Sequence, residues 1–148
     1  MRARARWHGF SLTELLVVVL IIGIIMAIGV PGYRQYVQRA NRVDATAGLL
    51  RIAAAQERFY LQQGSYASNA QLGLPPPAGL GIAGSERGYY NLSIESPDLV
   101  IGFTAVATPA AGEGQAGDDN CQRFSVNEQG QRAAEDGGGA ATLDLCWR

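Results

Sequence analysis

Three features of this chain carry residue types that do chemistry in proteins. Glu14 is an acid near the start of a long apolar run, and Gly9 marks the junction between that run and a short basic leader. An ionised carboxylate inside an apolar helix is costly, so we expect it to seek a cationic partner; the alternative is that it lies at the membrane interface and reaches water. Cys121 and Cys146 are the two cysteines, and they form a disulfide if they lie outside the cytoplasm.

The other reactive residues do not assemble into a recognisable catalytic or metal site. The one histidine, His8, lies in the leader, which argues against zinc and against Ser/His/Asp or Cys/His catalysis. Two G-x-G-x-x-G matches, 79–84 and 112–117, lie in loop-like sequence, whereas a dinucleotide site needs this loop between a strand and a helix. The Asp-Asp-Asn stretch at 118–120 has oxygen side chains that could ligate calcium, but it lacks the EF-hand spacing. We therefore predict no enzymatic activity, no cofactor and no metal.

The apolar run has the length of a membrane span. Phe10–Val30 comprises 21 residues, about 31 Å as a helix, which matches a hydrocarbon core of about 30 Å. Arginines at positions 2, 4 and 6 precede it, so the positive-inside rule keeps the N-terminus cytoplasmic. We expect one membrane pass, with the chain after Pro31 on the far side.

A secretory signal peptide and a buried core helix both match the run less well than a membrane span does. A signal peptide needs a small-residue cleavage site at the far end of the run, and positions 26–29 offer only a poor match. A buried core helix does not usually contain a 16-residue uncharged stretch, here Leu15–Val30, flanked by arginines.

Beyond the run, the pattern predicts an amphipathic continuation of the same helix. The helix is expected over 10–63, with Gly64 as its terminator. Pro31 removes a backbone hydrogen bond and should kink the helix, and Gly23 weakens the segment before it. The expected organisation is a leader (1–9), a membrane helix (10–30), its amphipathic continuation (31–63) and a head (64–148). The apolar stripe that we expect to be buried consists of Tyr36, Ala40, Val43, Ala47, Leu50, Ala54 and Leu61.

The C-terminal half has the pattern of a β-sheet. Strands are expected over 89–95, 99–108, 123–127 and 131–134, because these stretches alternate or are rich in β-branched residues. Proline-rich and glycine-rich sequence predicts loops over 65–85, 110–120 and 135–142. The sheet needs a surface on which to bury one face, and the helix supplies it. The fold class expected is therefore α+β, a long N-terminal helix packed against an antiparallel sheet with a disulfide-closed C-terminal region.

The charge distribution argues against a general nucleic-acid partner. The formal net charge is −1, but residues 61–148 hold four arginines and ten acids. A mildly acidic head lacks the basic patch that phosphate backbones require.

Taken together, these motifs resemble the type IVa pilins, with PilE-like minor pilins as the most similar subtype. Three blocks carry the resemblance. The first is 9–15 together with Gly23 and Pro31, the second is 55–60 with 64–67, and the third is 118–130 with Cys146 and Trp147. The resemblance covers the whole chain, although residues 68–117 match only in general character.

The resemblance implies a maturation and assembly pathway. A prepilin peptidase would cut between Gly9 and Phe10 and methylate the new amine of Phe10. Glu14 would then pair with the cationic N-terminus of a neighbouring subunit. The implied partners are other pilins, contacted through the N-terminal helix, the inner membrane and the pilus assembly platform. The implied location is the inner membrane for the precursor, then a filament that spans the periplasm and reaches the cell exterior.

The functional alternatives within this resemblance remain open. A minor pilin that joins or primes the pilus in motility, adhesion or DNA uptake is preferred. A major pilin shares the same N-terminus and cysteine pair, and a type II secretion pseudopilin shares the N-terminus. The cysteine pair and Trp147 favour the pilus over the pseudopilus. A DNA-receptor pilin would need more exposed arginines than Arg87, Arg123, Arg132 and Arg148 supply.

Overall fold

The chain's computed structural model describes residues 10–112 and 114–147, and it divides into two compact units, Met1–Tyr36 and Val37–Arg148. Helix α1 (Leu12–Gln63) contributes to both units and contains Pro31. It ends where Gly64 adopts a φ of 73°, a left-handed conformation that glycine accepts without strain. The backbone N–H of Gly64 donates to the carbonyl of Tyr60 at 2.8 Å, which closes the last turn.

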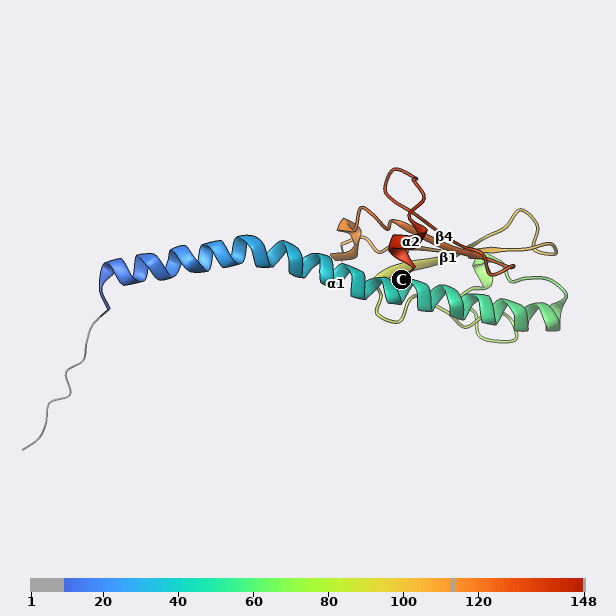
Figure 1. The fold of residues 1–148 in the computed structure, drawn as a ribbon. Helices are drawn as coiled ribbons and strands as arrows, with labels where there is room; N and C mark the ends of the chain where they lie inside the picture. The colour runs from blue at the N-terminus through green and yellow to red at the C-terminus, as the bar shows by residue number, and fades with distance from the viewer. Residues whose placement is uncertain (1–9, 113, 148) are drawn as a thin grey trace, which may run out of the picture. The chain divides into compact units, whose positions relative to one another are not determined.

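The second unit packs an antiparallel sheet on the C-terminal part of α1 (Figure 1). The four strands, which pair in chain order, are β1 (Tyr90–Glu95), β2 (Thr104–Pro109), β3 (Arg123–Asn127) and β4 (Arg132–Glu135). The register aligns Leu92 with Ala107, and Ala107 with Phe124. Short helices lie in the connections: η1 (Asn69–Gln71), η2 (Gly114–Gly117) and, near the C-terminus, α2 (Leu143–Cys146).

A single hydrophobic core lies between the sheet and α1. From the helix, Leu49 and Ile52 are fully buried, and from the sheet Phe124 and Ala107 are fully buried. Gly48 allows α1 to approach the sheet closely, because a Cβ at that position would lie 3.0 Å from the Leu92 side chain. This α+β arrangement of a long helix on an antiparallel sheet is the fold class expected from the sequence.

The predicted buried stripe of the helix is wrong. Val43, Leu50 and Leu61 are 59%, 45% and 85% exposed, and the alanines at 40 and 54 are exposed as well. Tyr36, in the first unit, is 71% exposed. The buried face of the helix is shifted by about one residue from the predicted stripe. Because it includes charged and polar side chains, its residues do not form a continuous apolar pattern in the sequence. Its members are Arg42, Asp44, Ala45, Gly48, Leu49, Ile52, Ala55, Gln56 and Phe59.

The second strand also differs markedly from the sequence prediction. The second strand begins at Thr104, not near residue 99, because the Asp98 carbonyl accepts hydrogen bonds from Ile101 and Gly102, both at 3.1 Å. The Asp98 side chain adds a bond from the Val100 N–H at 2.9 Å, so the stretch is a turn. Helix α2 was not predicted at all, whereas the third strand has the predicted limits.

Candidate functional site

The N-terminal assembly segment is the first candidate site. Phe10 is 80% exposed and Glu14 lies in the first turn of α1. Gly9, the other half of the expected cleavage position, lies outside the described residues. Gly23 and Pro31 both lie within α1, and the kink expected near them remains a prediction. By length and composition, α1 is able to cross a membrane.

Ser11 organises the start of α1. Its side-chain oxygen accepts a hydrogen bond from the backbone N–H of Glu14 at 3.2 Å and lies 2.8 Å from the Thr13 hydroxyl. Serine followed three residues later by glutamate is the sequence signature of a capping box, a local signal from which this cap could have been predicted. Among the described residues, the structure gives the Glu14 carboxylate no ion pair.

The second candidate site is the C-terminal region closed by the disulfide. Cys121 and Cys146 are bonded, with their Cα atoms 5.8 Å apart and a sequence separation of 25. Both are essentially buried, and they join the segment before β3 to α2. The two cysteines singled out in the sequence are thus brought together as expected.

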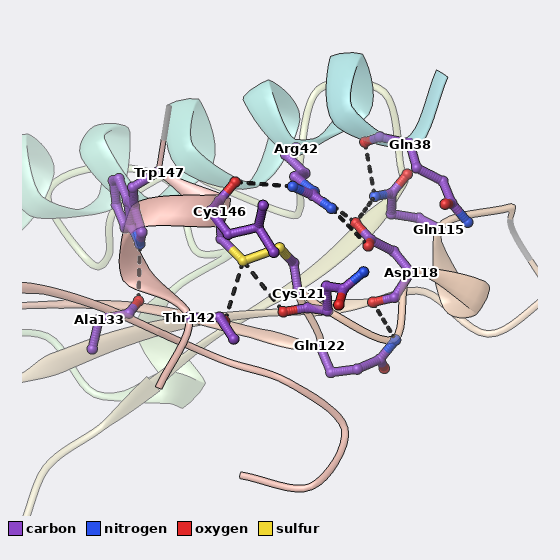
Figure 2. Close-up of a disulfide and its surroundings, with 12 residues drawn as sticks. Gln38, Arg42, Gln115, Asp118, Cys121, Gln122, Ala133, Thr142, Cys146 and Trp147 are labelled. Atoms are coloured by element: carbon purple, nitrogen blue, oxygen red, sulfur yellow. Dashed lines mark hydrogen bonds and ion pairs between the residues drawn. A yellow bond between two sulfur atoms is a disulfide. The ribbon is translucent and has the colours of Figure 1, made fainter. Parts of the chain in front are cut away.

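Arg42 of α1 is the residue that fixes this region to the helix (Figure 2). Its Nε and Nη2 donate to the two carboxylate oxygens of Asp118 at 2.7 and 2.8 Å, and its Nη1 donates to the Leu145 carbonyl at 3.0 Å. Arg42 and Asp118 are 7% and 2% exposed. This is the bidentate geometry in which an arginine–carboxylate pair is strongest.

The other two buried polar side chains of α1 have the same role toward other loops. The Asp44 carboxylate accepts hydrogen bonds from the backbone N–H groups of Arg87 and Tyr89 at 3.0 and 3.3 Å. Gln56 bonds both the N–H and the carbonyl of Ala67, at 2.7 and 2.9 Å. Hydrogen bonding removes the penalty of burying these groups, and each ties one connecting segment to the helix.

Trp147, which directly follows Cys146, packs against the sheet. Its indole N–H donates to the Ala133 carbonyl at 2.9 Å, and the Arg132 guanidinium lies 5.0 Å from its ring centroid. The ring also contacts Phe124 at a centroid distance of 6.3 Å, which links it to Tyr90 through a second edge-on contact at 5.6 Å. Guanidinium over indole is a favourable cation–π arrangement.

Tyr90 is the titratable group most altered by the fold. Its burial raises the pKa of the phenol well above the usual range, and the nearby Asp118 carboxylate adds to that effect. Within the part of the chain that the structure describes, neither the Tyr90 hydroxyl nor the Gln115 Oε1 has a hydrogen-bond partner. The described residues include no cluster of three or more His, Cys, Asp or Glu suited to a metal.

A membrane-length helix with an N-terminal acid, packed on an antiparallel sheet with a disulfide-closed C-terminus, defines a pilin-like class of protein. Comparisons with known proteins agree with this class. Residues 31–125 match the family model described as "Type IV minor pilin ComP, DNA uptake sequence receptor", and residues 8–30 match the "Prokaryotic N-terminal methylation motif". The chain belongs to the type IV pilin family.

Individual relatives support the same family. The chain is 31% identical over 128 residues to the "Type IV major pilin protein PilA" of Myxococcus xanthus, covering 85% of this chain and 55% of the relative. It is 30% identical over 100 residues to a "Fimbrial protein" of Neisseria meningitidis serogroup A, covering 68% and 56%. The chain thus spans about half the length of the curated relatives it matches.

A solved structure shares the fold. The non-core minor pilin PilV of Neisseria meningitidis aligns with a TM-score of 0.52 at 21% identity, covering 71% of this chain and 93% of that one. The chain therefore shares the fold of this pilin, and its N-terminal helix is long and apolar enough to cross a membrane.

Proposed function

We propose that this protein is a minor pilin, made as a membrane-anchored precursor and assembled into a type IV pilus. The match of residues 31–125 to a minor-pilin family model is the observation that carries this proposal. A major pilin is an alternative, because several relatives are named as major pilins. A type II secretion pseudopilin is a second alternative. The disulfide-closed region with Trp147 favours a pilus subunit over a pseudopilin.

Maturation is proposed to occur between Gly9 and Phe10. A prepilin peptidase would remove the leader and methylate the new amine, and a methylated amine keeps its positive charge. The N-terminal methylation motif matched over residues 8–30 supports this step. The platform that extracts pilins from the inner membrane would then add the mature chain to the filament.

Glu14 is proposed to receive the amine of a neighbouring subunit. The structure supports this role because Glu14 is exposed in the first turn of α1, four residues from Phe10. A carboxylate in the membrane costs about 2.5–3.5 kcal/mol near the centre and less toward the ends. Pairing it with a buried cation offsets that cost, whereas a buried amine without a partner is destabilising by roughly 3–5 kcal/mol.

The exposed apolar face of α1 is proposed as a contact surface for other pilins. Val43, Leu50 and Leu61 remain exposed although α1 packs its opposite face on the sheet. In the first unit, large apolar side chains such as Leu15 and Ile25 are exposed all round the helix. A soluble monomer rarely leaves so much apolar surface uncovered, so lipid and neighbouring helices are the expected surroundings.

Incorporation of Glu14 variants tests the proposal. The chain and its Glu14→Ala and Glu14→Gln variants are expressed at equal levels, and sheared filaments are compared with membranes by immunoblotting. We expect normal membrane insertion for both variants and a loss of at least tenfold in the filament fraction. The cap uses the backbone N–H of residue 14, which donates to Ser11 and is kept in both variants, so a defect shared by Gln and Ala points to the charge.

Asp119→Ala is the control, because Asp119 is an exposed acid of the head that lies outside α1 and its proposed contact surface. It should enter filaments normally. Wild-type incorporation of both Glu14 variants would refute the assembly role of the carboxylate.

DNA uptake is a second candidate function, because the matched family model is described as a DNA uptake sequence receptor. The excess of acids over arginines in the head does not favour DNA binding. In addition, Arg42, Arg51 and Arg123 form ion pairs with Asp118, Glu86 and Glu95, respectively. Duplex DNA titrated onto the purified protein at two salt concentrations tests this function. Salt-dependent binding weakened by Arg87→Gln and Arg132→Gln would support it, and absence of binding at about 50 mM salt would exclude it.

A further inference from the structure

One side chain of α1 holds both segments that carry the cysteines. Arg42 binds the Asp118 carboxylate and the Leu145 carbonyl with different nitrogens of the same guanidinium. Asp118 lies three residues before Cys121, whose backbone N–H donates to the Asp118 carbonyl at 3.0 Å. Leu145 directly precedes Cys146. None of these contacts involves a sulfur atom.

Further hydrogen bonds fix the orientation of Asp118. Gln115 donates from Nε2 to the Asp118 carboxylate at 3.0 Å and to the Gln38 carbonyl of α1 at 3.1 Å. Gln122 donates from its side chain to the Asp118 carbonyl at 3.0 Å. Figure 2 shows Gln38, Arg42, Gln115 and Asp118 converging between α1 and the disulfide. The segment before Cys121 is therefore anchored to the helix independently of Cys146.

A buried ion pair is not explained by stability alone. Hydrophobic replacements of such pairs are often neutral or stabilising, because desolvation of the charges offsets their attraction. Arginine gives something that an apolar residue does not, namely directional bonds to two separate chain segments. The position of those two segments, one on each side of the disulfide, indicates what the directionality achieves.

We propose that Arg42 is a positioning residue for oxidation of Cys121 and Cys146, a role that goes beyond the proposed function in the pilus. With both segments held on α1, the thiols meet at high effective concentration before any covalent bond exists. The non-covalent contacts then offset the entropic cost of closing a loop between cysteines with a sequence separation of 25.

The oxidation proceeds by two thiol–disulfide exchanges with an external disulfide, such as a periplasmic oxidant or oxidised glutathione. One cysteine thiolate attacks the external disulfide, forms a mixed disulfide and releases one thiolate. The second cysteine thiolate attacks the protein sulfur of that mixed disulfide, forms the Cys121–Cys146 bond and releases the other thiolate. The two electrons, with two protons, pass to the oxidant, which becomes two thiols. Only the second, intramolecular exchange depends on Arg42.

The test follows both exchanges in the reduced full-length chain in detergent micelles. Oxidised glutathione is added, samples are quenched with acid, and mass spectrometry measures the mixed and the internal disulfide over time. Arg42→Met should slow ring closure at least tenfold, Arg42→Lys should slow it less, and both should leave the first exchange within twofold of wild type. Arg51→Met is the matched control, since Arg51 lies on the same helix as Arg42 and its ion pair with Glu86, outside the helix, is exposed. The Arg51→Met chain should form the internal disulfide at the wild-type rate.

Backbone hydrogen exchange provides a second test, which does not require the Arg42→Met chain to fold. In a Cys121→Ala/Cys146→Ala chain, Arg42 should still dock the C-terminal segment. The backbone N–H groups of residues 146 and 147, bonded to the Thr142 and Leu143 carbonyls, should remain protected. Loss of their protection in that chain, or wild-type ring closure in Arg42→Met, overturns the proposal.

Discussion

Replacing Leu49 and Leu50 one at a time separates the two faces of α1. These leucines are adjacent in sequence, but Leu49 is fully buried against the sheet and Leu50 is 45% exposed. The sequence pattern places Leu50 in the buried stripe, and the structure places Leu49 there. Leu49→Ala should therefore destabilise the head strongly, and Leu50→Ala should do so weakly.

The difference in stability follows from what each truncation removes. Leu→Ala deletes three carbon groups, about 2.4 kcal/mol at roughly 0.8 kcal/mol for each one buried. At the fully enclosed Leu49 site a cavity adds to this, which gives about 3–4 kcal/mol in total. At Leu50 the removed atoms are partly hydrated already and leave no cavity, so the loss should stay near or below about 1 kcal/mol.

Thermal unfolding of a fragment from Val37 to the C-terminus measures these values, because that unit contains the whole hydrophobic core. The Leu49→Ala midpoint should lie roughly 8 °C or more below that of Leu50→Ala, at about 4 °C for each kcal/mol. In the full chain, Leu50→Glu should fold normally yet fail to enter filaments. Equal midpoints for the two alanine variants would refute the assignment of the faces.

Further predictions concern the disulfide, the buried phenol of Tyr90 and the contact between Gly48 and Leu92. Cys121→Ser should lower the free energy of unfolding by about 3 kcal/mol, since the bond closes a loop of 25-residue separation; identical melting of the oxidised and serine forms would contradict this. Because burial raises the pKa of Tyr90, its contribution to stability is complete below pH of about 10 and is lost as the pH rises toward the folded-state pKa. Tyr90→Phe should change the free energy of unfolding at neutral pH by about 1 kcal/mol or less. In denaturant titrations from about pH 7 to 11, it should reduce the loss of stability with rising pH. The same pH dependence in wild type and variant would count against the buried phenol. Gly48→Val should destabilise the fragment by about 1–3 kcal/mol, because its side chain would overlap Leu92, whereas Gly84→Val, where a Cβ meets nothing within 4 Å, should cost far less.

Much of the fold follows from local signals in the sequence. Gly64 ends α1 as predicted, because glycine alone accepts its φ of 73° without strain. The third strand has its predicted limits, and Gly130 turns the chain after it with a φ of 74°. Such features depend on a few neighbouring residues, so a pattern along the chain is sufficient to find them.

The buried face of α1 could not be found in the same way. Arg42, Asp44 and Gln56 interrupt its apolar pattern, and their burial depends on partners far away in sequence. Asp118, for example, lies 76 positions from Arg42. Helix α2 escaped prediction for a similar reason, since it is four residues long and is held by the disulfide and by Arg42.

The candidate sites divide along the same line. Glu14 and the cysteine pair were identifiable, because an acid in an apolar run is unusual by composition alone and two cysteines beyond an expected membrane span predict a disulfide. The network around Arg42 was not, because a charged residue in an amphipathic helix is assigned to the solvent face by default. The helix cap formed by Ser11 does have a local signal, serine three residues before glutamate, and that signal is sufficient to predict it.

The most direct test of the account is mass spectrometry of filaments sheared from cells that express the native chain. The account predicts a chain that begins with N-methylated Phe10, lacks residues 1–9, and is present at a small fraction of the most abundant pilin. Filaments in which this chain is absent, or retains Met1–Gly9, would contradict its assignment as a processed pilus subunit. A chain that dominates the filament would contradict the minor-pilin proposal.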